Sequence, residues 1–282
     1  MSIPAVFRKR LGESEPLRVD TSFLIREPAE AYHAQAGALL TSHELADFRK
    51  NPLLYRKKQL GLVVAEDRPA YLIGRAAHVL VLEGREAYER EYVVGGPVNP
   101  KTGERFGSRT KAFQEWAEAQ GKPVLDDEQA ALIENMNASV SAHEQASALL
   151  AEGVPEGVVR TEYCGLPCQA RLDWLDPERG IVDLKTCDNL DWLQMDARTY
   201  GYTHQLAFYR ALVVCATGAV LPVHLIAVEK REPFRCGVWR VGENVLEVAL
   251  IDNEEAISRL MTCRERNEWP TGYEGVREFD WM

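Results

Sequence analysis

The chain has 282 residues and a formal net charge of −10, from 33 lysines and arginines against 43 aspartates and glutamates. Hydrophobic residues make up 46% and charged residues 27%, which is ordinary for a globular protein and excludes a disordered chain, a collagen and a disulfide-framed mini-protein. The opening MSIPAVFRKRLGESEP lacks the apolar core of a secretory signal, and no apolar run reaches the roughly 18 residues of a membrane span. We therefore expect a cytoplasmic protein with reduced cysteines and no membrane partner.

Caps, chain breakers and apolar periodicity predict helices in the first half of the chain. Residues 1–30 are polar and punctuated by proline, so we expect an N-terminal arm or short strand, followed by one domain over 31–282. Thr41 and Glu44 have the spacing of a capping box. The glycine- and proline-containing stretch 95–110 predicts a mobile loop. Helices are expected from Thr41 to before Pro52, and at 52–60, 70–82, 111–120 and 128–152.

In the second half, short β-prone segments separated by Gly/Pro turns replace the helical pattern. These segments predict a three-strand meander, then two helices, two more strands and a closing amphipathic helix. We therefore expect an α/β or α+β fold with one mixed central sheet flanked by helices. The expected strands are 158–164, 168–175, 180–186, 222–230 and 234–241, and the expected helices are 190–200, 202–216 and 243–267.

The sharpest chemical feature lies on the meander. Asp183 and Lys185 are two residues apart, so their side chains point to one face of a strand, and Asp173 lies on the hairpin neighbour. Two carboxylates and an ammonium suit a hard divalent metal, and the lysine could orient or deprotonate an attacking water. The alternative is a surface Asp/Lys pair on an edge strand. The apolar neighbours favour a buried strand, where charges need partners or a metal; they are Ile181, Val182 and Leu184.

Two helical motifs accompany these charges. Gly74-x-x-x-His78 lies on the predicted buried helix, where Gly74 is expected to allow close approach to the sheet and His78 follows one turn later on the same face. The alternative is a core histidine with satisfied hydrogen bonds. Gln205-x-x-x-Tyr209 also has the spacing of one helix face, and its alternative is an amide and a phenol at the core boundary.

Taken in order, these motifs resemble the RecB-type branch of the PD-(D/E)xK nuclease superfamily, and more specifically the RecE-like exonucleases of the exonuclease VIII type. The resemblance covers about 32–269, and no single piece of it is specific. Its residues are Tyr32-His33, Ser42-x-x-Leu45, Pro52-x-x-Tyr55, Gly74-Arg75-Ala-Ala-His78, Gly165 to Asp173, Val182-Asp183-Leu184-Lys185-Thr186, Tyr200-Gly201-Tyr202-x-His204-Gln205-x-x-Phe208-Tyr209 and Glu268-Trp269-Pro270.

The resemblance implies a restriction-endonuclease-like core and a 5′→3′ exonuclease that degrades one strand of linear double-stranded DNA for recombination. It also implies Mg²⁺ or Mn²⁺, a ring-shaped homo-oligomer (trimer or tetramer) and, as a further partner, a single-strand annealing protein. By position, Asp173 and Asp183 match the metal-binding carboxylates, Lys185 the catalytic lysine and His78 the histidine that completes the metal shell. Gln205 and Tyr209 match residues that line the site near the DNA backbone.

The chain departs from the family pattern in two places. Leu172 precedes Asp173, where proline is common in the superfamily. The cysteine set that holds an iron–sulfur cluster in some relatives is absent, because Cys164-x3-Cys168 has the wrong spacing, so we expect no cluster. Glu162 on the first meander strand is a candidate ligand for a second metal, although a strand glutamate is usually a solvated surface residue.

Two locally basic stretches are candidates for contacts with DNA phosphates, which carry no sequence information. These are the helix pair at 49–58 and the loop at 101–111, and for both the alternative is a solvated charged face. Arg75 could bind a 5′ phosphate through two hydrogen bonds from its guanidinium. The named DNA-binding candidates are Arg75, Arg56, Lys57, Arg105, Arg109 and Lys111.

Two other functions stay open: a structure-specific or restriction-like endonuclease, and a non-catalytic recombination accessory protein.

Overall fold

A five-stranded mixed sheet forms the centre of the computed structural model, which describes residues 20–63 and 69–278. Its strands lie in the order in which they occur in the chain, and only the β5–β6 pair is parallel. The predicted α/β fold with a mixed sheet and the predicted meander are both confirmed. The strands are β3 (Val154–Tyr163), β4 (Leu166–Asp176), β5 (Gly180–Cys187), β6 (Val223–Glu229) and β7 (Cys236–Arg240).

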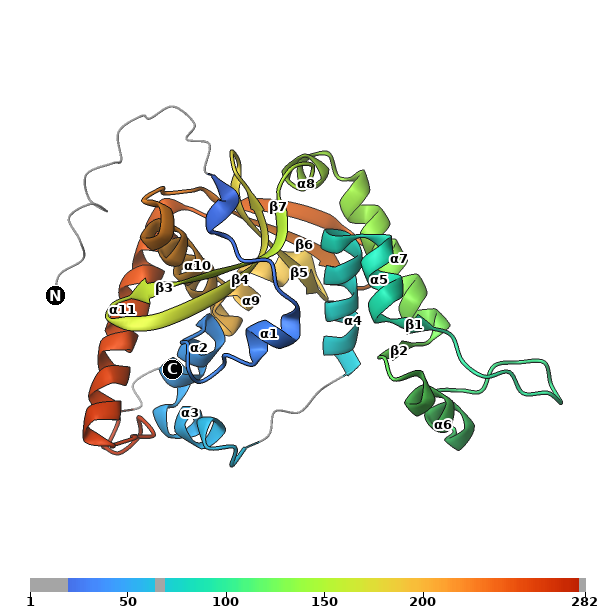
Figure 1. Cartoon of the computed structure of the whole chain (residues 1–282), viewed down its shortest axis with the longest axis horizontal. Helices are drawn as coiled ribbons and strands as arrows, with labels where there is room; N and C mark the ends of the chain where they lie inside the picture. The colour runs from blue at the N-terminus through green and yellow to red at the C-terminus, as the bar shows by residue number, and fades with distance from the viewer. Residues whose placement is uncertain (1–19, 64–68, 279–282) are drawn as a thin grey trace.

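Helices cover the sheet on both sides and enclose two main apolar clusters (Figure 1). One cluster packs α2 (Ser42–Lys50), α10 (Tyr202–Thr217) and α11 (Glu243–Arg266) against β3 and β4. The other packs α4 (Pro69–His78), α5 (Arg85–Glu91), α7 (Asp127–Ala142) and α8 (Glu144–Leu149) against β5 and β6. Each fully buried leucine or isoleucine in these clusters contributes about 2 kcal/mol, so the two layers fix the strands that carry the polar residues.

The parallel β5–β6 connection contains the two helices that the sequence predicts between the strands. It begins with the short turn η3 (Leu190–Trp192), continues through α9 (Leu193–Tyr200) and ends with α10. Gly201 joins the two helices with φ of +74°, in the left-handed region that favours glycine. Its carbonyl accepts a hydrogen bond from the backbone N–H of Gln205, so the turn determines where the first residues of α10 lie.

Several local features agree with the sequence and several differ. The Thr41 capping box forms at α2, and α3 (Pro52–Gln59) has proline in its first turn. The predicted helix 128–152 is interrupted at His143, whose extended backbone ends α7 and whose Nδ1 accepts the Ala146 N–H to cap α8. Strand β3 begins at Val154, earlier than predicted, because the Pro155–Gly157 segment resembles a turn but pairs with β4.

Smaller elements complete the fold. Helix α4 is followed by a π-helical turn, η2 (Val79–Glu83), and a two-strand parallel ladder joins β1 (Val93–Val94) to β2 (Val124–Leu125), which the sequence did not predict. The segment between β1 and α6 (Lys111–Gln120) has no helix or named strand and projects from the body (Figure 1).

The start of the described chain lies along β3. The turn η1 (Thr21–Phe23) precedes a bridge between Ile25 and Val158, and α1 (Ala29–His33) follows. Residues 1–19 of the predicted N-terminal arm lie outside the described residues. All six cysteines are free thiols, and in 20–63 and 69–278 no helix is both long and apolar enough to cross a bilayer.

Candidate active site

Separation of β4 and β5 positions the first carboxylate. The two strands form only three residue pairs, of which Trp174–Val182 is the last before the strands diverge. Beyond that point the Asp173 carboxylate accepts the Leu184 N–H, at 2.9 Å from Oδ2. The side chain thus satisfies a backbone donor that a continued ladder would have used. The same separation leaves room for polar groups between the strands.

His78, at the end of α4, contacts both strands at this point. Its Nδ1 lies 2.8 Å from the Gly74 carbonyl, and its Nε2 lies 2.6 Å from the Leu184 carbonyl and 3.3 Å from Asp173 Oδ2. Carbonyl oxygens only accept hydrogen bonds, so both ring nitrogens carry protons in this arrangement. Burial alone would lower the pKa of His78, but the hydrogen bond and charge of Asp173 raise it to about 9. The same contact lowers the pKa of Asp173 to about 2, against the opposing effect of burial.

Asp183 and Lys185 form the second half of the cluster on β5. Lys185 Nζ lies 2.7 Å from Asp183 Oδ2, while Asp183 Oδ1 is buried without a hydrogen-bond partner among the described residues. Burial and the charge of Asp173 raise the pKa of Asp183 to about 6. The pKa of Lys185 is also raised, because the two carboxylates outweigh burial. The Lys185 ammonium lies 5.2 Å from the ring centroid of Tyr202, within the range of a cation–π contact.

The Gln205–Tyr209 pair on α10 borders the same charges. Gln205 Nε2 donates to the Tyr209 hydroxyl at 2.7 Å. Burial raises the pKa of Tyr209 well above its usual value, and the carboxylates of Asp173 and Asp183 add to the shift. The structure therefore brings together six residues that the sequence singles out: His78, Asp173, Asp183, Lys185, Gln205 and Tyr209.

Sequence reasoning missed a glutamate beside this cluster. Glu156 lies on β3 with φ of +53° and makes a 2.8 Å ion pair with Arg171. Burial raises the pKa of Glu156 to about 8, and Asp173 adds to the effect. A longer predicted β3 would have placed Glu156 opposite Asp173, but Pro155 and Gly157 favour a turn there.

A histidine at the start of α2 was also missed. His43 is exposed, yet desolvation by the surrounding protein lowers its pKa, and the positive charge of Lys185 lowers it further, against the charges of Asp47 and Asp173. His43 lies between the family-like residues Ser42 and Leu45, so motif position was the only signal available for it.

Glu162 does not join the cluster. It is exposed near the β3–β4 turn and opposes Pro167. Six residues of strand separate it from Glu156, or roughly 20 Å along β3. In this structure Glu162 is a surface residue, as strand glutamates usually are.

The candidate DNA-contact residues are spread over three elements. On α3, Lys57 is exposed and Arg56 lies over the Trp269 ring, 5.2 Å from its centroid. In and after the projecting segment, Arg105 pairs with Asp127 at 2.7 Å and Lys111 with Glu115 at 3.3 Å. Arg109 is exposed in that segment, and Arg75 is exposed on α4, one turn before His78.

Gly74 has a different role from the one predicted. A Cβ at this position would lie 3.6 Å from Thr186 Oγ1, which is ordinary van der Waals contact. Close approach of α4 to the sheet therefore does not require glycine, and the expectation is wrong on that point. What the structure does use is the Gly74 carbonyl, which accepts the His78 Nδ1–H.

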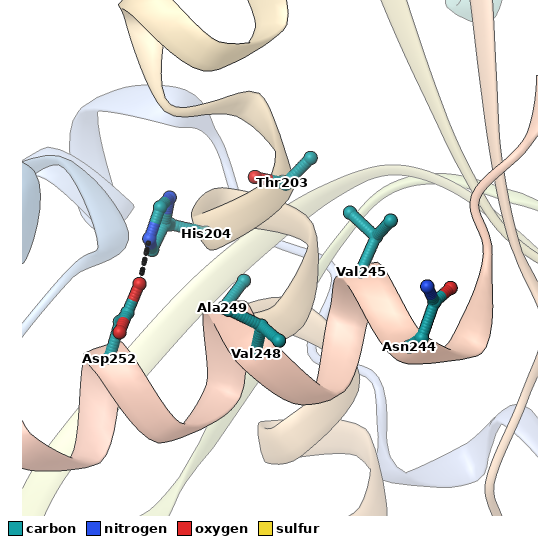
Figure 2. Close-up of a pocket in the computed structure, with 7 residues that line it drawn as sticks. All are labelled: Thr203, His204, Asn244, Val245, Val248, Ala249 and Asp252. Carbon is teal, nitrogen blue, oxygen red and sulfur yellow. Dashed lines mark hydrogen bonds and ion pairs between the residues drawn. The ribbon is translucent and has the colours of Figure 1, made fainter.

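A separate pocket lies between α10 and α11 and is shown in Figure 2. In it His204 Nε2 lies 3.1 Å from Asp252 Oδ2, and Val245 and Val248 contribute apolar surface. None of the six clustered residues lines this pocket. It is therefore distinct from the candidate active site.

The donor set of the cluster fits a hard divalent cation. Asp183 Oδ1 is a buried oxygen to which no described residue donates a hydrogen bond, and Asp173 and the Leu184 carbonyl supply further oxygens. Within the described ranges, no three His, Cys, Asp or Glu side chains are grouped tightly enough to hold an ion on their own. This agrees with Mg²⁺-type chemistry, in which one or two carboxylates suffice and waters complete the shell. His78 would have to give up a proton and the Leu184 contact to act as a ligand.

Comparisons with known proteins identify the family. Residues 42–278 match the model of DUF3799, a PDDEXK-like domain of unknown function. The chain belongs to this family. The match confirms the resemblance to the PD-(D/E)xK superfamily. No curated protein matches the chain.

Solved structures show the same fold for this PDDEXK-like chain. A protein from Eubacterium rectale named "Putative exonuclease" is 17% identical, with a TM-score of 0.67 over 92% of this chain and 97% of that one. At that identity the likeness shows the fold alone. An alkaline exonuclease from Laribacter hongkongensis is 11% identical, with a TM-score of 0.30 over 57% of this chain and 86% of that one, which is too low to support an argument.

Proposed function

We propose that this chain is a metal-dependent exodeoxyribonuclease that degrades one strand of linear double-stranded DNA, 5′→3′, in end resection for recombination. The observation that carries the proposal is the cluster itself. Two carboxylates on neighbouring strands, Asp173 and Asp183, meet a lysine and a histidine, and one buried carboxylate oxygen has no hydrogen-bond partner in the part of the chain that the structure describes. Perturbed ionisable groups gathered at one place are typical of catalytic sites. Membership of a PDDEXK-like family supports the same chemistry.

Each residue of the cluster has a role that follows from its contacts. Asp173 is held in place by the Leu184 N–H and by His78. The carboxylates of Asp173 and Asp183, together with the Leu184 carbonyl, would hold Mg²⁺ or Mn²⁺. When bound, such an ion lowers the pKa of a water and offsets phosphate charge. Lys185 is held between Asp183 and the Tyr202 ring. Its ammonium can orient the attacking water and stabilise the negative charge that builds up on the phosphate.

The wider assembly follows from the family resemblance. We propose that DNA phosphates contact Arg75, the α3 cations and the projecting segment, that the chain forms a trimeric or tetrameric ring, and that a single-strand annealing protein docks on it. Cationic side chains suffice for the phosphate contacts, because the backbone presents the same charges whatever the sequence. Light scattering would give the mass of the assembly directly.

Substrate topology separates exonuclease from endonuclease. We expect the purified chain with Mg²⁺ or Mn²⁺ to degrade a linear duplex and to leave the covalently closed circle of the same sequence intact. Release of label from the 5′ end before the 3′ end gives the polarity. Nicking or linearisation of the circle would instead support a structure-specific or restriction-like endonuclease with this core.

Two substitutions test the cluster itself. Asp183→Ala and Lys185→Ala should each lower nucleotide release by at least about a hundredfold, the usual scale for removing a preorganised charged group. Glu118→Ala and Lys122→Ala are matched charge controls at exposed positions and should behave as the parent. Parental rates in the two cluster variants would contradict the assignment and favour a non-catalytic accessory protein.

A further inference from the structure

A second, positively charged pocket lies away from the candidate active site. It has a volume of about 540 Å³ and lies between α2, α11 and the segment that follows α11; α2 and α11 are labelled in Figure 1. None of the clustered residues His78, Asp173, Asp183 or Lys185 lines it. Four of its lining residues are cations and none is a carboxylate: Arg49, Lys50, Arg259 and Arg277.

Two of these cations have no counter-ion among residues 20–63 and 69–278. Neither Lys50 nor Arg259 makes an ion pair or hydrogen bond through its side chain with any residue in the described part of the chain. Arg49 Nη1 donates to a neutral acceptor, Asn253 Oδ1, at 3.1 Å. Arg277 lies over the Tyr273 ring, 4.1 Å from its centroid, and donates to the Gly272 carbonyl.

Two acids bear on this charge: Glu274, which belongs to the turn beside the pocket, and Asp252, whose charge partly offsets that of Arg49. Glu274 accepts hydrogen bonds from the backbone N–H groups of Thr271 and Gly272, so its carboxylate is used within its own turn. Burial lowers the pKa of Arg49, and the positive charge of Arg259 lowers it further although Asp252 opposes both. Like charges held together in a concavity repel each other, and an anion bound among them relieves that repulsion.

We propose that this pocket binds the phosphate groups of a nucleotide or of a single-stranded nucleic acid. Three of its cations are arginines, whose planar fork matches phosphate oxygens in bidentate pairs. The exposed ring of Tyr273 offers a face on which a base can stack. The volume lies in the range of pockets that hold small ligands, so one nucleotide unit fits. The basic stretch at 49–58 already contains Arg49 and Lys50, but Arg259 and Arg277 lie more than 200 residues later, so their meeting in one pocket could not be predicted from the sequence.

The inference goes beyond the proposed nuclease function and does not depend on it. Phosphate binding at this pocket needs no metal and no cleavage, so it is measured in EDTA. Loss of nuclease activity and loss of pocket binding are therefore separate results. A chain that binds through this pocket but cleaves nothing would contradict the proposed function and leave this inference standing.

The test measures binding of a fluorescent oligothymidylate of about 12 nucleotides, within the usual size of a single-strand site. Lys50→Ala and Arg259→Ala alter exposed positions, so folding should be retained, which circular dichroism checks. Each should weaken binding about five- to thirtyfold and reduce the slope of log affinity against log salt by about 0.7. Arg240→Ala removes an exposed cation on β7 outside the pocket and is the matched control.

Competition separates the two sources of phosphate. If millimolar dTMP displaces the oligonucleotide from the parent but not from Arg259→Ala, a free mononucleotide is sufficient to occupy the pocket. Binding that dTMP does not displace, but that both pocket variants weaken, identifies the strand. Pocket variants that bind as tightly as the parent, or that weaken binding no more than Arg240→Ala, would overturn the proposal.

Discussion

Charge balance explains the arrangement of the catalytic candidates at the scale of single residues. The two carboxylates are close enough for the charge of Asp173 to raise the pKa of Asp183, and without cations their repulsion and burial would be costly. His78 compensates Asp173 at 3.3 Å, and Lys185 compensates Asp183 at 2.7 Å. The compensation is incomplete, because Asp183 Oδ1 has no hydrogen-bond partner among the described residues and the pKa of Asp183 stays raised at about 6. The cluster thus holds negative charge that a divalent cation would neutralise.

Tyr202 positions Lys185, which its ring meets at 5.2 Å. A half-buried cation–π contact contributes about 1 kcal/mol, so Tyr202→Ala should lower kcat for nucleotide release about five- to tenfold. Tyr202→Phe keeps the ring and should stay within about twofold of the parent. The measurement is the initial rate at saturating linear duplex. Equal losses in the two variants would show that the hydroxyl, not the ring, matters.

The two glutamates of β3 give a matched pair. Above about pH 8, where Glu156 carries its charge, Glu156→Gln removes the 2.8 Å ionic partner of Arg171 beside Asp173 and His78, so we expect an activity loss of about tenfold, equivalent to about 1.4 kcal/mol. Glu162→Gln removes the same charge from an exposed position at the far end of the strand and should leave the rate unchanged. If Glu162→Gln lowered the activity and Glu156→Gln did not, the result would support the role of Glu162 as a metal ligand that the sequence suggested.

At the scale of elements, Glu229 connects the end of β6 to η3 and to the β6–β7 turn. Its buried carboxylate accepts from Arg235 through both oxygens, at 2.7 and 2.9 Å, and from the Leu190 N–H at 2.9 Å. The hydrogen bonds from Arg235 lower the pKa of Glu229 to about 2. A carboxylate with a lowered folded-state pKa stabilises the fold above its unfolded pKa near 4.5. That contribution is lost as the pH falls toward 2.

Glu229→Gln should therefore reduce the free energy of unfolding by about 2–3 kcal/mol at pH 7. The difference from the parent should shrink as the pH is lowered from about 4.5 toward 2. Urea unfolding followed by circular dichroism measures it across this range, and Glu118→Gln at an exposed helical position is the control. A difference that does not change with pH would show that lost packing, rather than the charge, is responsible.

Local signals in the sequence were enough for most elements and failed where tertiary contacts decide. The Thr41 capping box and the Gly201 break between α9 and α10 are set by residues close in sequence. The early start of β3 depends on its pairing with β4, and the break at His143 depends on a histidine cap that apolar periodicity does not register, so periodicity extended one helix and shortened one strand. For the site, strand alternation predicted Asp183 and Lys185 on one face. Glu156 needed the β3–β4 register, which no local pattern gives.

At the scale of the whole molecule, a net charge of −10 does not prevent local sites of either sign. The candidate active site gathers carboxylates between β4 and β5, while the pocket beside α2 and α11 gathers cations. Long-range repulsion between this chain and DNA is screened beyond about 8–10 Å at physiological salt, so local fields decide binding. The two sites differ in what they would take: a divalent cation at one and phosphate groups at the other.

Metal binding to the native fold should therefore be visible as a gain in stability without any DNA. A ligand at 100 times its dissociation constant stabilises the native state by about 2.7 kcal/mol, which is about 5–10 °C in Tm for a chain of this size. We expect Mg²⁺ or Mn²⁺ in excess to produce such a rise by differential scanning fluorimetry, with KCl of equal ionic strength as the salt control. Asp183→Asn should abolish the rise, because it removes the buried charge that attracts the ion, whereas Glu162→Gln should retain it. A rise that survives in Asp183→Asn would place the bound cation elsewhere on the molecule.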